Sequence, residues 1–119
     1  MTPTTTVEVI GSRSSLVLAA IVDTGFSGDI CVPIDIAVGL GLELVRRTKV
    51  ELADGSMRSE LVFAGQVRFV GEERDVEILV TERDDPLVGV GLLSSCRLVI
   101  DFTKGRLDLT RPNRRTSRR

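Results

Sequence analysis

The chain has 119 residues, which is enough for one domain but not for two full lobes. Hydrophobic residues make up 42% of it and charged residues 28%, as in an ordinary globular domain. It contains no His, which excludes Ser–His and Cys–His nucleophilic schemes and every His-based metal site. Aromatic residues make up only 3%, without Trp or Tyr, and this disfavours a base-stacking surface for nucleic acid.

The formal charge of −1 hides an asymmetry between the two parts of the chain. The last ten residues, 110–119, hold five Arg and no acidic residue, so the preceding part is clearly acidic. An acidic body argues against a nucleic-acid-binding fold. We therefore expect a single domain over 1–109 and a basic, disordered tail over 110–119. An electrostatic contact of this tail with an acidic partner is the alternative interpretation.

The two cysteines and the first residues show no pattern of a disulfide framework, a metal site or a signal peptide. Cys31 and Cys96 both lie in apolar surroundings, and two residues are too few for a disulfide framework or a metal site. We expect buried structural thiols. Residues 1–10 lack the basic start and apolar core of a signal peptide, and no apolar run reaches membrane-spanning length. The sequence predicts a cytoplasmic protein without a metal, a cofactor or a membrane partner.

Apolar and β-branched runs, separated by Gly and Pro, predict about eight short strands and two short helices. In chain order, the expected strands cover residues 4–10, 15–22, 29–32, 42–52, 57–70, 75–80, 97–102 and 106–109, with a buried strand end at 87–89. The expected helices cover residues 34–40, with Pro33 as the first helical residue, and 91–95. These elements indicate an all-β, small closed barrel-like domain.

Three short stretches stand out at predicted turns or strand ends. Asp54-Gly55 lies between two strands and is a strong hairpin signal, because both turn positions favour positive φ. Asp23-Thr24-Gly25 follows the apolar run over 15–22. Leu87-Val88-Gly89 also ends an apolar run at a glycine after a hairpin. This stretch and Asp23-Thr24-Gly25 therefore form a weak internal repeat.

Together these features resemble the retropepsin-like aspartic peptidases. The resemblance rests on Asp23-Thr24-Gly25 after an apolar strand, on the Asp54-Gly55 hairpin that follows, and on Leu-Val-Gly-Val-Gly-Leu-Leu over 87–93. The sequence is most similar to the small prokaryotic branch whose motif reads Asp-Thr-Gly-Phe. The resemblance covers about Val7 to Leu109 and implies a retropepsin-like closed barrel that functions as a two-fold homodimer.

The resemblance also implies a role for each motif. Asp23 would be the catalytic residue, one from each chain, beside its symmetry mate. The loop around it would be supported by Thr24, Gly25, Phe26 and Ser27. A flap closing over the substrate would be formed by Ala53, Asp54, Gly55 and Ser56. Packing beneath the loop would come from Leu87, Val88 and Gly89.

Such a pair of carboxylates shares one proton, so one can act as general base on a water while the other donates to the scissile carbonyl. The expected partners are a second copy of the chain and a peptide or unfolded protein segment as substrate. Only one Asp-Thr-Gly occurs in the sequence, so a single chain would hold half an active site.

The sequence departs from viral members of the family in two places. Phe26 stands where many relatives carry Ala or Ser, and it offers no hydroxyl to a charged dyad, so we expect activity nearer neutral pH. Val90-Gly91 stands where viral members carry Arg and Asn. Their polar brace beneath the loop is missing here, and something else must hold the loop.

Other interpretations remain at this point. The fold could serve as a non-catalytic dimeric module that binds peptide or only assembles, because a fold does not fix a function. The chain could also be a plain β-domain in which Asp23 merely caps a turn. Asp101 loosely repeats the context of Asp23, but no Thr-Gly follows it, so we expect a structural role.

Overall fold

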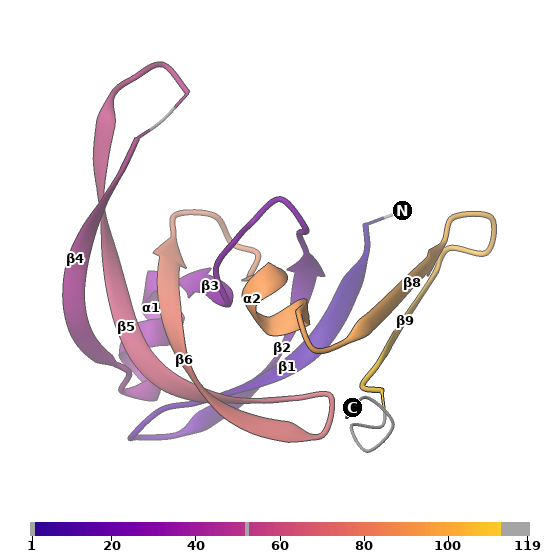
Figure 1. Cartoon of the computed structure of the whole chain (residues 1–119). Helices are drawn as coiled ribbons and strands as arrows, with labels where there is room; N and C mark the ends of the chain where they lie inside the picture. Colours follow the sequence, from indigo (N-terminus) through magenta and orange to yellow (C-terminus); the bar gives the residue numbers. More distant parts are fainter. Residues whose placement is uncertain (1, 52, 113–119) are drawn as a thin grey trace, which may run out of the picture.

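The computed structural model describes residues 2–51 and 53–112, in which strands dominate (Figure 1). The strands are β1 (Thr4–Ile10), β2 (Ser15–Val22), β3 (Ile30–Pro33), β4 (Glu43–Glu51), β5 (Met57–Phe69), β6 (Glu72–Thr81), β7 (Leu87–Val88), β8 (Arg97–Asp101) and β9 (Arg106–Thr110). The helices are α1 (Ile34–Leu40) and α2 (Val90–Leu93).

Seven of these strands form one sheet that closes on itself. Their order is β1-β2-β7-β3-β6-β5-β4, and β1 pairs in addition with β5. This closing contact is antiparallel and joins Glu8–Ile10 to Gln66–Arg68. β4 lies outside the closed part as an edge strand on β5, and β8 and β9 form a separate two-stranded sheet. The predicted all-β closed barrel with two short helices is confirmed.

The interior of the barrel is filled by alternate side chains of its strands. Val7 and Val9 of β1 point inward with at most 1% of their surface exposed, whereas the neighbouring positions of β1 are more exposed. Leu92 closes the core from α2, and the largest fully buried side chain is Phe69. Each such side chain contributes roughly 1.5–3 kcal/mol by leaving water. The period of two that the sequence shows is the period with which the barrel is filled.

Two crossed connections occupy the centre of the sheet. β3, which follows β2, pairs parallel with β6, and β7, which follows β6, pairs parallel with β2. β3 and β7 then pair antiparallel with each other, Ile30 opposite Val88 and Cys31 opposite Leu87. The chain thus forms two interlocked strand–loop–strand units, β2–β3 and β6–β7, and the two apolar-then-Gly stretches end the first strand of one unit and the second strand of the other.

Several element boundaries differ from the prediction by one to three residues. Pro33 ends β3 and caps α1 rather than opening the helix. The β5–β6 turn is tighter than expected, because β6 already begins at Glu72, and Val70 takes a positive φ of 49° there. α2 begins at Val90, one residue early. Neither helix of the described residues is long and apolar enough to cross a membrane.

Both cysteines are free thiols, Cys31 buried and Cys96 half-buried. Burial raises the pKa of the Cys31 thiol to about 11, the charge of Glu60 adds to this, and a hydrogen bond with Thr81 opposes it. Cys31 therefore remains protonated at neutral pH, which fits the predicted structural role.

The ordered chain extends past the boundary that we placed at residue 109. Thr110 is the last residue of β9, opposite Arg97. Arg111 donates hydrogen bonds to the carbonyl oxygen of Phe69 (3.0 Å) and to the hydroxyl of Ser95 (2.6 Å). Its guanidinium, 14% exposed, also lies 3.1 Å from a carboxylate oxygen of Glu72. Residues 113–119 of the predicted tail lie outside the described residues.

Arg111 joins the end of β9 to the β5–β6 turn, so its removal should destabilise the fold. We expect Arg111→Ala to lower the free energy of unfolding by about 1–3 kcal/mol, because the carbonyl of Phe69 and the hydroxyl of Ser95, both in part-buried hydrogen bonds, lose their donor. Urea denaturation measures this. Arg97→Ala, at an exposed position of β8, is the control and should change stability by less than about 0.5 kcal/mol. Equal effects of the two substitutions would contradict the role given to Arg111.

The raised pKa of Cys31 predicts a pH effect on stability. Between pH 9.0, the ordinary pKa of a thiol, and about pH 11, the unfolded thiol ionises while the folded thiol stays protonated. The folded state then binds more protons, so stability falls as pH rises through this window. We expect the urea midpoint to fall less steeply between pH 9 and pH 11 for Cys31→Ser than for the wild type. Parallel slopes would show that the thiol does not contribute.

Candidate active site

The Asp-Thr-Gly stretch forms the loop between β2 and β3. Asp23 is half-buried at the end of β2, whereas Thr24 and Gly25 are exposed. The backbone N–H of Asp23 donates to the carbonyl oxygen of Val88 (2.9 Å), which continues the β2–β7 ladder into the loop. Oδ1 of Asp23 accepts a hydrogen bond from the backbone N–H of Gly25 (2.9 Å). The carboxylate is therefore oriented by its own loop and presented at the surface of the chain.

The segment from β7 into α2 holds the loop from below through backbone hydrogen bonds. The N–H of Gly89 donates to Asp29 (3.0 Å), that of Val90 to Phe26 (2.8 Å) and that of Gly91 to Gly28 (3.0 Å), each to a carbonyl oxygen. These backbone hydrogen bonds hold the loop in place of the Arg and Asn side chains that this sequence lacks there. Backbone groups need no particular side chain, so Val and Gly are compatible with this brace.

Glycines are required where the two segments touch. A Cβ on Gly89 would lie 2.5 Å from the carbonyl oxygen of Phe26 and 2.4 Å from that of Gly28. A Cβ on Gly28 would lie 2.7 Å from the ring of Phe26. The Phe26 ring thus covers the loop glycines and fills space above Gly89. Val88 and Gly89 form backbone hydrogen bonds with Asp23 and Asp29 of this loop, and Leu87 precedes them in β7.

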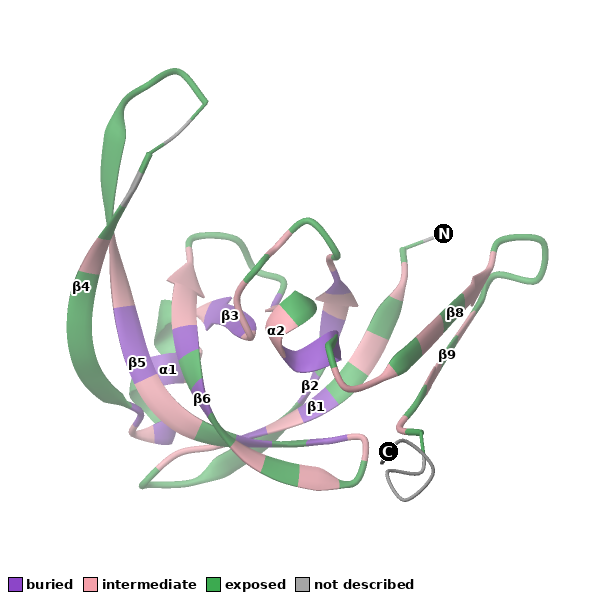
Figure 2. Cartoon of the chain, viewed as in Figure 1, coloured by how far each residue is buried: buried purple, intermediate pink, exposed green. Residues whose placement is uncertain are grey.

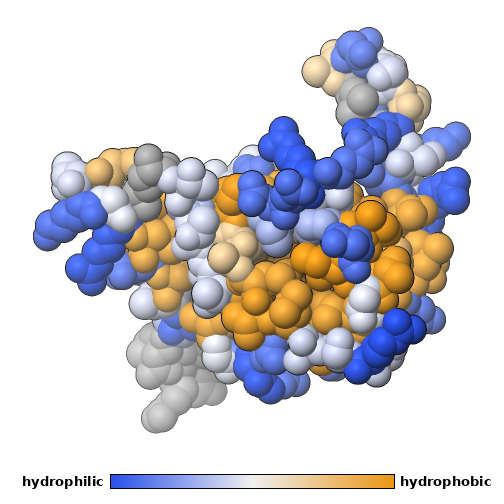
Figure 3. Space-filling model, turned by 180° about the vertical axis from the view of Figure 1, so that it is seen from behind, coloured by the Kyte–Doolittle hydropathy of each residue, from blue (hydrophilic) through white to orange (hydrophobic). Residues whose placement is uncertain are grey.

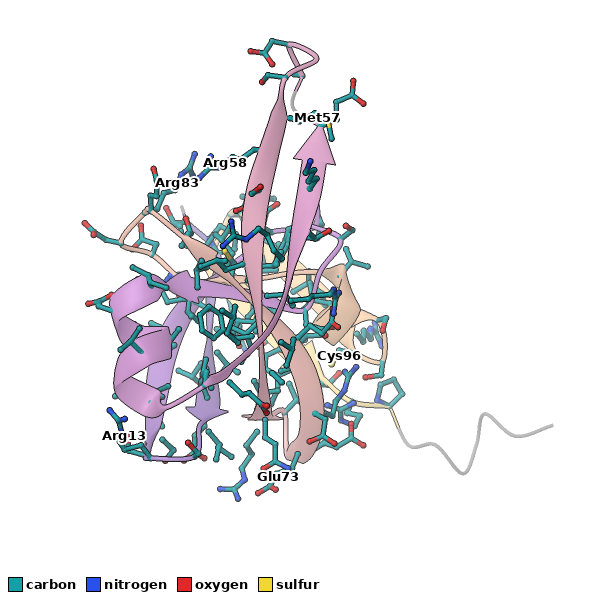
Figure 4. The ribbon with its side chains drawn as sticks, turned by 90° about the vertical axis from the view of Figure 1, so that its left-hand side faces the viewer. Arg13, Met57, Arg58, Glu73, Arg83 and Cys96 are labelled. Carbon is teal, nitrogen blue, oxygen red and sulfur yellow. The ribbon has the colours of Figure 1, made fainter. Side chains whose placement is uncertain are left out.

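The predicted flap is the hairpin between β4 and β5, which projects from the barrel (Figures 1 and 2). Its tip, with Ala53, Asp54, Gly55 and Ser56, is exposed. Ser56 donates its hydroxyl (2.6 Å) and its backbone N–H (2.9 Å) to Oδ1 of Asp54, and this lowers the pKa of Asp54. Gly55 has a φ of 88°. Met57 lies near the tip and Glu73 at the opposite end of the molecule (Figure 4).

A pocket of about 340 Å³ opens between the Asp23 loop and the base of this hairpin. It is lined by Ser27, Gly28, Asp29, Arg46, Thr48, Val62, Glu77 and Leu79. Arg46 of β4 donates two hydrogen bonds to the carboxylate of Glu77 on β6, one of them at 2.7 Å. These bonds hold the pKa of Glu77 below its ordinary value.

The pocket residues Asp29, Arg46 and Glu77 were not among the predicted site residues. Arg46 and Glu77 are 31 residues apart and meet only because β4 and β6 flank β5 in the sheet. Asp29 accepts a 3.4 Å hydrogen bond from the backbone N–H of Glu77, again across two elements. Each is a charged residue in or beside a strand, as are many others in the chain, so no local pattern distinguishes it.

Asp101, which loosely repeats the sequence context of Asp23, has the structural role that we expected. Its Oδ1 accepts hydrogen bonds from the hydroxyl (2.5 Å) and the N–H (3.0 Å) of Thr103, and from the N–H of Lys104 (3.3 Å). These bonds lower the pKa of Asp101 and fix the β8–β9 turn. Among residues 2–51 and 53–112, no group of three or more His, Cys, Asp or Glu is arranged to hold a metal ion.

Comparisons with known proteins bear on the fold. The structure is similar to the solution structure of a simian foamy virus protease, with a TM-score of 0.55 and 18% identity over 73% of this chain and 87% of that one. It is also similar to the crystal structure of the retroviral protease-like domain of Ddi1 from Leishmania major. That match has a TM-score of 0.52 and 15% identity, and covers 95% of this chain and 97% of the domain.

No protein-family model and no curated protein sequence matches the chain. The two structural likenesses show that it has the retropepsin-like fold of the aspartic peptidases, as the motifs predicted. At this level of identity they carry no information about individual residues.

The close approach of Gly89 to the Asp23 loop can be tested by a single methyl group. We expect Gly89→Ala to destabilise the protein by roughly 1–3 kcal/mol, because its Cβ would meet backbone oxygens that cannot move without breaking the brace. Gly39→Ala in α1 is the matched control, since a Cβ there meets nothing within 4 Å. It should stabilise the helix by up to about 1 kcal/mol. Urea denaturation distinguishes the two, and a neutral Gly89→Ala would contradict the packing described.

Proposed function

We propose that this protein is a homodimeric aspartic endopeptidase with one Asp23 carboxylate from each chain at its centre. The observation that carries the proposal is the position of its single Asp-Thr-Gly. The loop lies at the surface of a retropepsin-like fold, braced by β7 and α2, and beside a projecting hairpin and an open pocket. One chain offers one carboxylate, and a two-fold dimer would supply the second.

The chemistry follows from two carboxylates that cannot both ionise easily at short distance. The ionised Asp23 takes a proton from a water molecule whose oxygen attacks the carbonyl carbon of the peptide. The protonated Asp23 of the second copy donates to the carbonyl oxygen, which gives a tetrahedral intermediate. Collapse of this intermediate breaks the C–N bond, and a proton delivered to the nitrogen releases the amine.

The loop residues have distinct tasks in this proposal. Thr24 is exposed, and its hydroxyl would bond across the two-fold axis and brace the paired loops. Gly25 donates its N–H to Asp23 and lets backbone approach closely. Phe26 packs on the loop but offers no hydroxyl to the dyad, so we propose activity near neutral pH, consistent with work in the cytoplasm.

The substrate would be an extended peptide or an unfolded protein segment, held beneath the β4–β5 hairpin. One of its side chains would enter the pocket beside the loop. The pocket has two carboxylates, Asp29 and Glu77, and one guanidinium, Arg46. This balance favours a neutral or basic substrate side chain over an acidic one.

The central test is removal of the carboxylate. We expect Asp23→Asn to lower cleavage of an unfolded-protein or peptide library by at least about 100-fold, because proton transfer at both Asp positions is lost. Asp35→Asn is the control, since Asp35 is exposed on α1 and outside the candidate site. Peptide fragments are followed by mass spectrometry.

Subunit mixing gives a second readout of the same proposal. Excess Asp23→Asn protein should lower the rate of the wild type, because mixed dimers hold only one carboxylate. An equal excess of Asp35→Asn protein keeps Asp23 in every dimer and should raise the total rate. Equal cleavage by the wild type and Asp23→Asn would overturn the catalytic role of Asp23. Peptide binding by the wild type without turnover would instead favour the non-catalytic dimeric module.

A further inference from the structure

Arg74 of β6 is an arginine at an inward-facing position of the barrel. It precedes Val76 and Ile78 on the same face of the strand, and both of these side chains are buried. It also lies opposite Val67 of β5, whose side chain is fully buried. Arg74 itself is half-buried. A charged head at such a position needs polar partners, because burial removes water from it.

The acidic residues next to Arg74 in the sequence are engaged with other side chains. The pairs are Glu72 with Arg111, Glu73 with Arg68, and Asp75 with Gln66. Among residues 2–51 and 53–112, no carboxylate forms an ion pair with Arg74. Its positive charge is therefore left for groups of another kind.

The partners of Arg74 are two carbonyl oxygens of α2. Nη1 of Arg74 donates to Leu92 and Nη2 to Gly91, each over 3.5 Å. This distance is long for a hydrogen bond, so much of the attraction is that between the positive charge and two carbonyl dipoles. The hydroxyl of Ser94 also donates to the Gly91 oxygen (3.1 Å). The carbonyl groups of α2 are thus held from β6.

α2 needs such support because it is short. It has four residues and no side-chain hydrogen bond at its N-terminus. A single helical turn is not stable on its own. Its N–H groups nevertheless hold the candidate site, since Val90 donates to Phe26 and Gly91 donates to Gly28. Gly91 therefore joins the two contacts, because its N–H bonds to the Asp23 loop and its carbonyl oxygen faces Arg74.

We propose that Arg74 is a positioning residue for the Asp23 loop. Its charge holds the carbonyl groups of α2, and the N–H groups of α2 hold the loop that carries the carboxylate. The consequence for catalysis rests on the proposed function, whereas the link between Arg74 and the loop does not. Two Asp23 carboxylates can share one proton only while both loops keep their positions.

The chain offers two controls for a change at Arg74. Arg68 is an exposed arginine on the neighbouring strand β5, and its guanidinium pairs with the carboxylates of Glu8 and Glu73. Seen from behind, apolar side chains gather over β2 and α1 (Figure 3), and Val17 of β2 is 64% exposed. Substitutions of Arg68 and Val17 therefore change a charged and an apolar surface side chain without touching the contacts of α2.

Amide hydrogen exchange, followed by NMR, tests the proposal without any use of catalysis. Arg74→Met keeps most of the aliphatic stem but removes the charge and the donors. We expect the N–H groups of Val90 and Gly91 to exchange at least about tenfold faster, because their bonds to the loop open locally. Exchange in β1 should rise by less. Arg68→Met and Val17→Thr should leave exchange at Val90 and Gly91 unchanged.

Two further variants separate the charge from the packing of the side chain. Arg74→Lys keeps the charge, and we expect exchange at Val90 and Gly91 within about threefold of the wild type, because one ammonium replaces a two-armed guanidinium. Arg74→Gln is neutral, should exchange faster than Arg74→Lys, and replaces Arg74→Met if that variant does not fold. Unchanged exchange in the neutral variants, equal exchange in Arg74→Lys, or an equal rise throughout β1 would each overturn the proposal.

Peptide cleavage provides the second measurement. We expect Arg74→Met to lower kcat by about tenfold, because a displaced carboxylate reacts slowly. KM should change less than kcat, since the interaction lost acts on the reacting group rather than on substrate binding.

The two measurements separate the two proposals. If exchange responds to Arg74 as expected but the wild type cleaves no peptide, the peptidase proposal fails and the role of Arg74 stands. If cleavage depends on Asp23 but neither exchange nor kcat responds to Arg74, the role of Arg74 fails and the peptidase proposal stands.

Discussion

The structure depends on the backbone hydrogen bonds between the loop after β2 and the segment that runs from β7 into α2. Through them, two strand–loop–strand units cross, and each unit completes the sheet of the other. The bonds require close contact between two main chains, which is why Gly28 and Gly89 have no side chain to place there. They also explain why one aspartate can be held steadily at the surface. The backbone ladder of the buried strands, rather than contacts with neighbouring side chains, fixes the position of Asp23.

A chain with a single Asp-Thr-Gly faces a constraint that a two-lobed enzyme does not. Under the proposed function, its site must stay open toward a second copy, so the residues around Asp23 cannot be covered by the chain itself. Thr24 and Gly25 are accordingly exposed. The single chain lacks the stabilising free energy that contact with a second copy would add.

Much of the fold and the position of Asp23 could be predicted because local patterns encode them. The period of two marks the strands, Asp54-Gly55 marks its hairpin, and apolar runs that stop at Gly mark both crossed units. The pocket could not be predicted, because Arg46 and Glu77 meet only through the register of three strands. The role of Arg111 could not be predicted from the composition of the chain around it. It begins an Arg-rich stretch, and that composition does not reveal its burial against the β5–β6 turn.

The floor and the roof of the candidate site differ in how firmly they are held. The floor is the Asp23 loop, fixed by backbone hydrogen bonds to buried strands. The roof is the β4–β5 hairpin, whose inner half is anchored because β5 pairs with β6, and whose outer half has exposed side chains (Figure 2). Near the pocket, β4 contacts β6 through the Arg46–Glu77 pair. That pair is about half exposed, and ion pairs in contact with water stabilise little. Opening the roof for a substrate therefore costs little, whereas moving the floor would break the crossed units. This difference suits a peptidase, since the reacting carboxylate must stay in place while a long peptide enters and leaves.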